Sequence, residues 1–241
     1  MRDLLASAVQ RTFTGWSWLL LALGGVAACM LAAVGFALST DGLSAQEATD
    51  GVARVWFTLL LFSALWAANV VTRDHATGAV GRIVHVSGSR ARGMAVSMLV
   101  SVGMGLAYGV LAGGLAAASP WVFLRSADIA PVWGPSTTHT VLGVFVVTAL
   151  AAPWGAAVGW LVRSQVGAIG ILLVQALLVD ELVQHIAPRV GRYALTMAMG
   201  SVYGDGRPGL LAVPAALAVI VVWLAVGTCA AWAAARRRDV L

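Results

Sequence analysis

Six long apolar stretches, separated by short polar segments, restrict what this chain can fold into more than any other feature. A helix needs about 20 apolar residues to cross the hydrocarbon core of a bilayer. Five of the stretches are about this long. The remaining one, which is the fifth in chain order, is shorter. The stretches are Trp16–Leu38, Val55–Val71, Met94–Ala118, Thr140–Val162, Val166–Val179 and Leu210–Ala233. The sequence therefore predicts an all-α membrane protein with six transmembrane helices, which form a single transmembrane domain over residues 1–241.

The short fifth stretch, Val166–Val179, needs a separate explanation. At a rise of 1.5 Å per residue it would cover only about 21 Å, whereas the hydrocarbon core is about 30 Å thick. The helix must therefore extend past Asp180 and Glu181, or it must stop early and continue as irregular structure.

The composition excludes other classes of protein. Hydrophobic residues make up 60% of the chain and charged residues 10%, whereas about a quarter of the residues in a soluble domain are charged. A water-facing surface cannot be covered with so few charges, so a soluble enzyme and a disordered chain are both excluded. The basic residues are all arginine, and they are scattered at the ends of the apolar stretches. This distribution indicates membrane topology, and we expect no nucleic-acid partner.

The charges also predict the orientation. With six spans, both termini and the loops after the second and fourth spans lie on one side of the membrane. This side carries most of the arginines, and the other side carries most of the acidic residues. Because basic residues accumulate in cytoplasmic loops, we expect a multi-pass protein of the cell (plasma) membrane with both termini in the cytoplasm.

The segment before the first span predicts an amphipathic helix over residues 1–14. Leu4, Leu5, Ala8, Val9 and Phe13 would share one helical face. Such a helix lies in the membrane interface with its apolar face toward lipid. A frayed N-terminal tail is the alternative.

The cytoplasmic loop over residues 72–92 is too long for a minimal turn between two helices. Val80, Ile83, Val84 and Val86 have helical spacing and are surrounded by polar residues, which predicts a short amphipathic helix that ends near Gly88. Its apolar face needs a cover, which could be membrane lipid or a groove on a soluble partner.

These features together resemble the membrane subunit of a type-2 ATP-binding-cassette (ABC) exporter, the ABC-2-type permease. Members of that family have an N-terminal amphipathic helix, six spans and a cytoplasmic loop after the second span. In that loop, an acidic residue lies four positions before a Gly-Thr pair, an apolar run and a Pro-x-Ser-Arg-like end. The matching residues here are Asp74, Gly78, Val80, Ile83, Val84, Ser89 and Arg90. The chain departs from the pattern at Ala79, which replaces the threonine, and it lacks the proline and the lysine that often opens the third span.

The resemblance implies that the loop is a coupling helix in a cleft of a separate ATPase subunit. The residues expected to contact that subunit are Asp74, Thr77, Gly78, Val80, Arg82, Ile83 and Val84. ATP and Mg would be bound by the partner ATPase, since this chain has no GxxxxGK[ST] phosphate loop, and we expect no cofactor on the chain itself. A second permease subunit, identical or homologous, would complete the membrane part. The substrate path would be lined by spans one, two and five, and the cargo would be an amphipathic drug, antibiotic, peptide or lipid.

The outer loop over residues 180–208 contains an apolar segment, Tyr193–Tyr203, that is too short to span a bilayer. It predicts two short helices that dip into the outer leaflet, which in the resembled family are re-entrant helices at the outer end of the path. An ordinary loop on the membrane surface is the alternative. The candidate residues for a substrate exit or gate are Asp180, Glu181, Tyr193 and Met197. The two acids could attract a cationic substrate, pair with Arg189 or Arg192, or be solvated interface charges.

Other functions receive less support from the sequence. A structural or assembly factor without an ATPase partner is the main alternative. An intramembrane enzyme would need a catalytic base at membrane depth, and no predicted span supplies a histidine or an acid there, so we expect no catalytic residue. The histidines all lie outside the predicted spans, and we expect no metal site. The spacing of Gly105, Gly109 and Gly113, and of Gly155 and Gly159, predicts close helix contacts, either within one subunit or between two.

Overall fold

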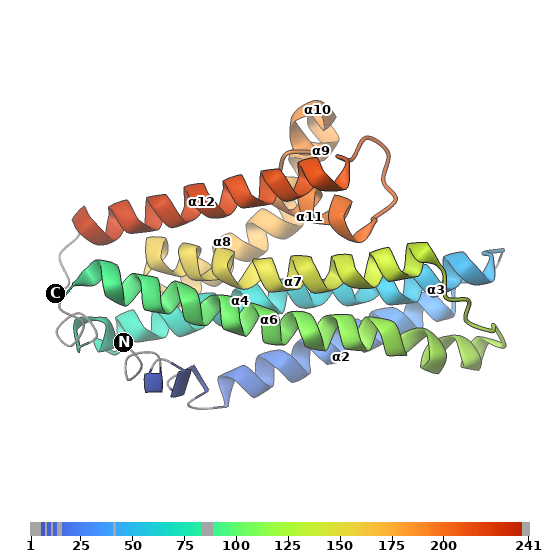
Figure 1. Cartoon of the computed structure of the whole chain (residues 1–241), viewed down its shortest axis with the longest axis horizontal. Coiled ribbons are helices and arrows are strands. Elements are labelled where there is room, and N and C mark those ends of the chain that lie inside the picture. The colour runs from blue at the N-terminus through green and yellow to red at the C-terminus, as the bar shows by residue number, and fades with distance from the viewer. Residues whose placement is uncertain are drawn as a thin grey trace.

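The computed structural model describes residues 6–7, 9–10, 12–13, 16–40, 42–82 and 89–237, and every described element is a helix. The long helices run roughly parallel to one another along the longest axis of the molecule (Figure 1). The α-helices are α2 (Ser17–Ala37), α3 (Ala45–Arg54), α4 (Leu59–Ala76), α6 (Arg90–Phe123), α7 (Pro135–Val162), α8 (Gln165–Val174), α9 (Asp180–Ile186), α10 (Pro188–Gly191), α11 (Leu195–Tyr203) and α12 (Val213–Arg237). The other helical segments are the 3₁₀ helices η1 (Val55–Thr58) and η2 (Leu124–Ala127) and the π-helix η3 (Gln175–Val179).

Within the described residues, six helices are long and apolar enough to cross a membrane. This confirms the predicted six-helix, multi-pass architecture. The helices are Ser17–Ala37, Ala45–Ala76, Ala91–Phe123, Pro135–Val162, Gln165–Ile186 and Val213–Arg236. The second helix begins ten residues earlier than predicted, at Ala45 instead of Val55, because α3, η1 and α4 form one continuous segment. Ser44 starts this segment with a capping box, in which its side chain and that of Glu47 satisfy each other's backbone N–H groups.

The fifth helix takes the first of its two predicted courses. It extends past Asp180 and Glu181 to Ile186, through α8, η3 and α9. In the middle, the Asp180 N–H donates to the carbonyl of Gln175, five residues earlier, which inserts a π-turn into the helix. Such π-turns are rare and often occur at functional sites.

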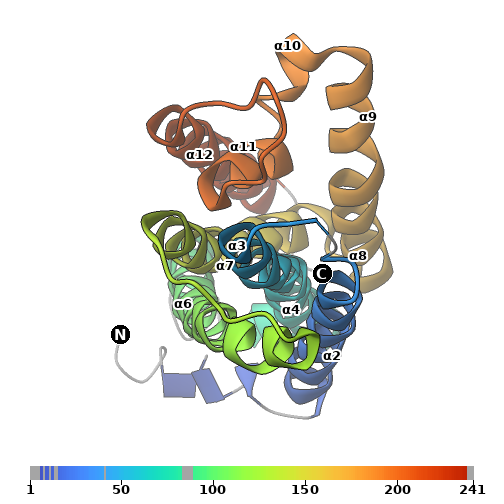
Figure 2. The ribbon, with the colours of Figure 1, turned by 90° about the vertical axis from the view of Figure 1, so that its right-hand side faces the viewer.

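Helix α7 lies in the centre of the bundle and packs against α4 and α6 through glycines (Figure 2). A Cβ atom at Gly155 would lie 2.0 Å from the carbonyl O of Ala64 in α4, and one at Gly105 would lie 2.1 Å from the carbonyl O of Ala149 in α7. Helices can approach this closely only where a glycine removes the side chain. The regularly spaced glycines of α6 and of α7 therefore allow close packing within one chain, which was one of the two predicted uses.

The outside of the bundle carries large apolar side chains, which is typical of a lipid-facing surface. Helices α2, α8, η3, α9 and α12 lie at the periphery and expose most of these residues (Figure 2). A soluble protein rarely exposes so much contiguous apolar surface. The exposed residues include Leu20, Leu31, Leu38, Val166, Leu177, Leu178, Leu182, Val221 and Val222.

The predicted interface helix over residues 1–14 lies largely outside the described residues. Of its described part, Phe13 packs edge-on against Trp18 and Trp66, with ring centroids 5.7 and 5.5 Å apart. This contact joins the segment before the first span to the side of the bundle, near α4.

Candidate functional site

Two adjoining cavities lie between α4, the π-turn of the fifth helix, and α11. The larger has a volume of about 380 Å³, and the smaller, of about 20 Å³, has room for about one water molecule. They share Leu60 and Leu61 of α4, Ala176 of η3 and Thr196 of α11. The other residues that line the larger cavity are Phe57, Thr58, Leu177, Glu181, Met197, Tyr203, Asp205 and Arg207.

An aromatic pair forms one wall of the larger cavity. The rings of Phe57, in η1, and Tyr203, at the end of α11, stack with centroids 4.8 Å apart and planes at 15°. Burial raises the pKa of the Tyr203 phenol above its usual range, and the nearby Asp205 carboxylate adds to the shift. The wall is therefore uncharged at neutral pH. It ends where Gly204 adopts a left-handed φ of 72° and stops α11.

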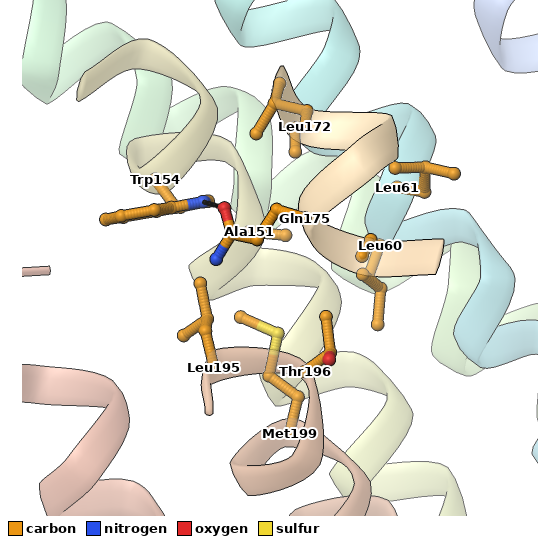
Figure 3. Close-up of a pocket in the computed structure, with 11 residues that line it drawn as sticks. Leu60, Leu61, Ala151, Trp154, Leu172, Gln175, Leu195, Thr196 and Met199 are labelled. Atoms are coloured by element: carbon orange, nitrogen blue, oxygen red, sulfur yellow. Dashed lines mark hydrogen bonds between the residues drawn. The ribbon is translucent and has the colours of Figure 1, made fainter. Parts of the chain in front are cut away.

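The smaller cavity lies beside the π-turn, and one polar side chain enters it from there. Figure 3 shows Leu60 and Leu61 of α4, Trp154 of α7 and Gln175 of the π-turn around this cavity. The Trp154 indole Nε1 donates to the Gln175 side-chain oxygen at 3.2 Å. This bond joins the fifth helix to the central helix at the point where the regular α-helical hydrogen bonding is interrupted.

Charged side chains form the mouth of the larger cavity. Arg207 Nη1 donates to both carboxylate oxygens of Glu181, at 2.9 and 2.7 Å, and Arg207 Nε is 2.8 Å from the Asp205 carboxylate. The hydrogen bond that Arg207 donates to Glu181 raises the pKa of the Arg207 guanidinium, so the guanidinium stays charged. The partner of Glu181 is therefore Arg207, and not the predicted Arg189 or Arg192. These contacts tie α9 to the connection between α11 and α12, residues 204–212.

Asp180 has a structural role next to the cavity. Only 5% of the surface of this residue is exposed, so Asp180 is not the solvated interface charge that was one of its predicted roles. The carboxylate accepts from the Thr196 backbone N–H at 3.0 Å and from the Thr196 hydroxyl at 2.7 Å. The residue at the N-cap of α11 is Ala194, which has no side chain for capping. Asp180 therefore caps α11 from another helix, where a negative charge is favourable.

The four predicted exit residues divide into two groups. Glu181 and Met197 line the larger cavity, and Asp180 supports it through Thr196. Tyr193 lies outside both cavities. Its carbonyl accepts from Trp223 Nε1 of α12 at 2.9 Å, and its hydroxyl accepts from Arg192 Nη2 at 3.1 Å.

The described part of the predicted coupling loop, residues 72–82 and 89–92, lies at the opposite end of the bundle (Figure 1). Helix α4 ends at Ala76, Gly78 follows with a left-handed φ of 66°, and residues 79–82 are again helical. Thr77, Gly78 and Arg82 are exposed, and Asp74 is half-buried. Ile83 and Val84 lie outside the described residues.

Val80 is placed differently from the other loop residues. Only 4% of its surface is exposed, and it packs in one apolar cluster with Met94, Trp160 and Ala235. Its side chain therefore fixes the loop to the bundle of the same chain. In the described part of the loop, the exposed residues that a partner could contact are Ala76, Thr77, Gly78, Arg82 and Arg92.

The sequence analysis did not identify several residues of the site. Gln175 is a lone polar residue in an apolar stretch, and this signal could have identified it. Phe57, Tyr203 and Arg207 carry no such signal, because their importance depends on the approach of α11 and its following connection to α4 and α9. Among the described residues, no group of three or more His, Cys, Asp or Glu side chains could hold a metal ion.

The fold and the site define a multi-pass helical membrane protein with an amphipathic cavity near one end of its helix bundle. In comparisons with known proteins, no family model matches the chain and no curated sequence matches it. The function must therefore be inferred from the sequence pattern and the arrangement of the site.

Proposed function

We propose that this chain is the transmembrane permease subunit of an ABC exporter. The observation that carries the proposal is the course of α4. Its first turns, at Leu60 and Leu61, line both cavities, and its last turn leads directly into the loop with Thr77, Gly78 and Arg82. One helix thus connects a surface that could receive a force to a cavity that could hold a cargo, and packed helices transmit such displacements as rigid elements.

In the proposed mechanism, a cytoplasmic ABC ATPase subunit contacts the loop and binds ATP and Mg. Closure of two ATPase subunits moves the loop, and α4 transmits the displacement to the cavity wall. This chain supplies neither the nucleotide site nor the chemistry. A second permease subunit, identical or homologous, completes the membrane part. The cargo is an amphipathic drug, antibiotic, peptide or lipid.

The proposal also fixes the placement in the membrane. Both termini and the coupling loop lie in the cytoplasm, and the cavity mouth with Glu181 and Arg207 faces the outside of the cell membrane. The short helices α10 and α11 are re-entrant helices of the outer leaflet. The arginine distribution supports this orientation.

The test is association with an ATPase. The full chain is co-expressed with the ABC ATPases encoded nearest to its gene and is purified in detergent through a tag on this chain only. We expect an ATPase to co-purify with the wild type. The variant Arg82→Glu, which reverses an exposed charge on the loop, should lose that association.

The matched control is Arg125→Glu, which makes the same charge reversal on an exposed side chain at the other end of the bundle. It should keep the ATPase bound. If no ATPase associates with the wild type, or if both variants behave alike, the permease proposal fails, and a structural or assembly role without an ATPase partner becomes the better hypothesis.

A further inference from the structure

The larger cavity has two kinds of wall, and together they restrict the chemistry of its ligand. Most of the lining is apolar or aromatic, and it comes from η1, α4, η3 and α11. The mouth carries the carboxylates of Glu181 and Asp205 and one guanidinium, that of Arg207. The cavity therefore suits a molecule that is mostly apolar and carries one charged group.

The balance of charges at the mouth determines the sign of that group. Two carboxylates face one guanidinium, so the lining has a net negative charge. Arg54 donates to the backbone carbonyl of Asp205 at 3.1 Å, but its side chain does not line this cavity. A cation is also favoured beside the faces of aromatic rings such as the Phe57–Tyr203 pair.

The ion pairs at the mouth can be exchanged. The side chains of Arg207 and Glu181 are 44% and 53% exposed, and ion pairs in contact with water contribute little to stability. Another cation that reaches the mouth from the apolar side can therefore replace the guanidinium. Because Arg207 lies on the connection between α11 and α12, this replacement would release that connection from α9.

We propose that the larger cavity binds amphipathic organic cations, whose apolar part lies against Phe57, Leu61 and Met197 while the cationic group replaces Arg207 between Glu181 and Asp205. The inference rests on the proposed export function and names its substrate class. Binding of the cation breaks the contacts of Arg207 with Glu181 and Asp205, and this releases the connection between α11 and α12 from α9.

The test is equilibrium binding of radiolabelled tetraphenylphosphonium to the full chain in lipid nanodiscs, without an ATPase. The matched control ligand is tetraphenylborate, which has the same four phenyl groups and the opposite charge. We expect saturable binding of the cation only. Glu181→Gln and Asp205→Asn should each weaken it about fivefold, as loss of one partly exposed charge interaction does. Arg207→Gln should strengthen it, because the competing cation is removed.

Two further variants keep the result interpretable. Asp128→Asn removes an exposed carboxylate that does not line the cavity, and it should bind like the wild type. Leu61→Trp fills the cavity and should abolish binding while the chain still elutes as a single species. Equal binding of the cation and the borate, or weaker binding by Arg207→Gln, would overturn the proposal. Neither result depends on ATPase association, so the site and the permease proposal fail separately.

Discussion

The close contact between α4 and α7 makes a quantitative prediction for Gly155→Ala. The added Cβ atom would lie 2.0 Å from the Ala64 carbonyl O and 2.7 Å from the Ala64 Cα atom, so it meets backbone that cannot rotate away. Overpacking of this kind costs about 1–3 kcal/mol, and the better helix propensity of alanine returns at most about 1 kcal/mol. We therefore expect a net loss of up to about 2 kcal/mol, which lowers Tm by up to about 8 °C for a chain of this size.

The assay is thermal unfolding in detergent, followed by the loss of the monodisperse peak in size-exclusion chromatography. The matched control is Gly114→Ala in α6, where a Cβ atom would have no neighbour within 4 Å. There, the helix propensity alone acts, and stability should stay the same or rise. If Gly155→Ala and Gly114→Ala have the same Tm, the reasoning that glycine allows α4 and α7 to approach is refuted.

Three further predictions concern the site. Asp180→Ala should lower the free energy of unfolding by about 1–3 kcal/mol, since the N–H and hydroxyl of Thr196 lose their buried acceptor. Thermal unfolding measures this loss, and an unchanged Tm would contradict the capping role of Asp180. Gln175→Leu should lower the free energy of unfolding by about 0.5–1 kcal/mol through loss of the Trp154 hydrogen bond. It should also change the tryptophan fluorescence spectrum, and an unchanged spectrum would show that the hydrogen bond is absent. Arg207→Gln should change the free energy of unfolding by about 1 kcal/mol or less, because the ion pairs of Arg207 are partly exposed. A decrease in Tm as large as that of Asp180→Ala would contradict this and would show that the ion pairs at the cavity mouth stabilise the fold.

The sequence predicted the helical elements well because lipid leaves a spanning segment few other conformations. Backbone groups without water must bond within the segment, so a long apolar stretch becomes a helix. The same reasoning left two courses open for the fifth helix, because Val166–Val179 is too short to span the bilayer alone. The longer of the two, which extends past Glu181, is correct. The π-turn at Gln175–Val179 had no sequence signal, because it depends on the neighbours that hold Gln175 and Asp180.

The site was less predictable, since its residues meet only through tertiary packing. Glu181 was a candidate because of its position at the predicted membrane boundary, and Met197 belongs to the short apolar segment of the outer loop. Both line the larger cavity. Arg207 lies 26 residues after Glu181 in the chain, and no helical or loop spacing joins them. Val80 shows the same limitation, because its apolar character fitted a partner surface and a buried position equally well, and it packs within the chain.

The most direct test of the permease proposal is the ATP turnover of the partner ATPase with and without this chain in lipid nanodiscs. The proposal predicts that the chain raises turnover, that Arg82→Glu removes the increase, and that Arg125→Glu keeps it. Equal turnover in the presence and absence of the chain would contradict the proposal that a partner ATPase acts through this loop.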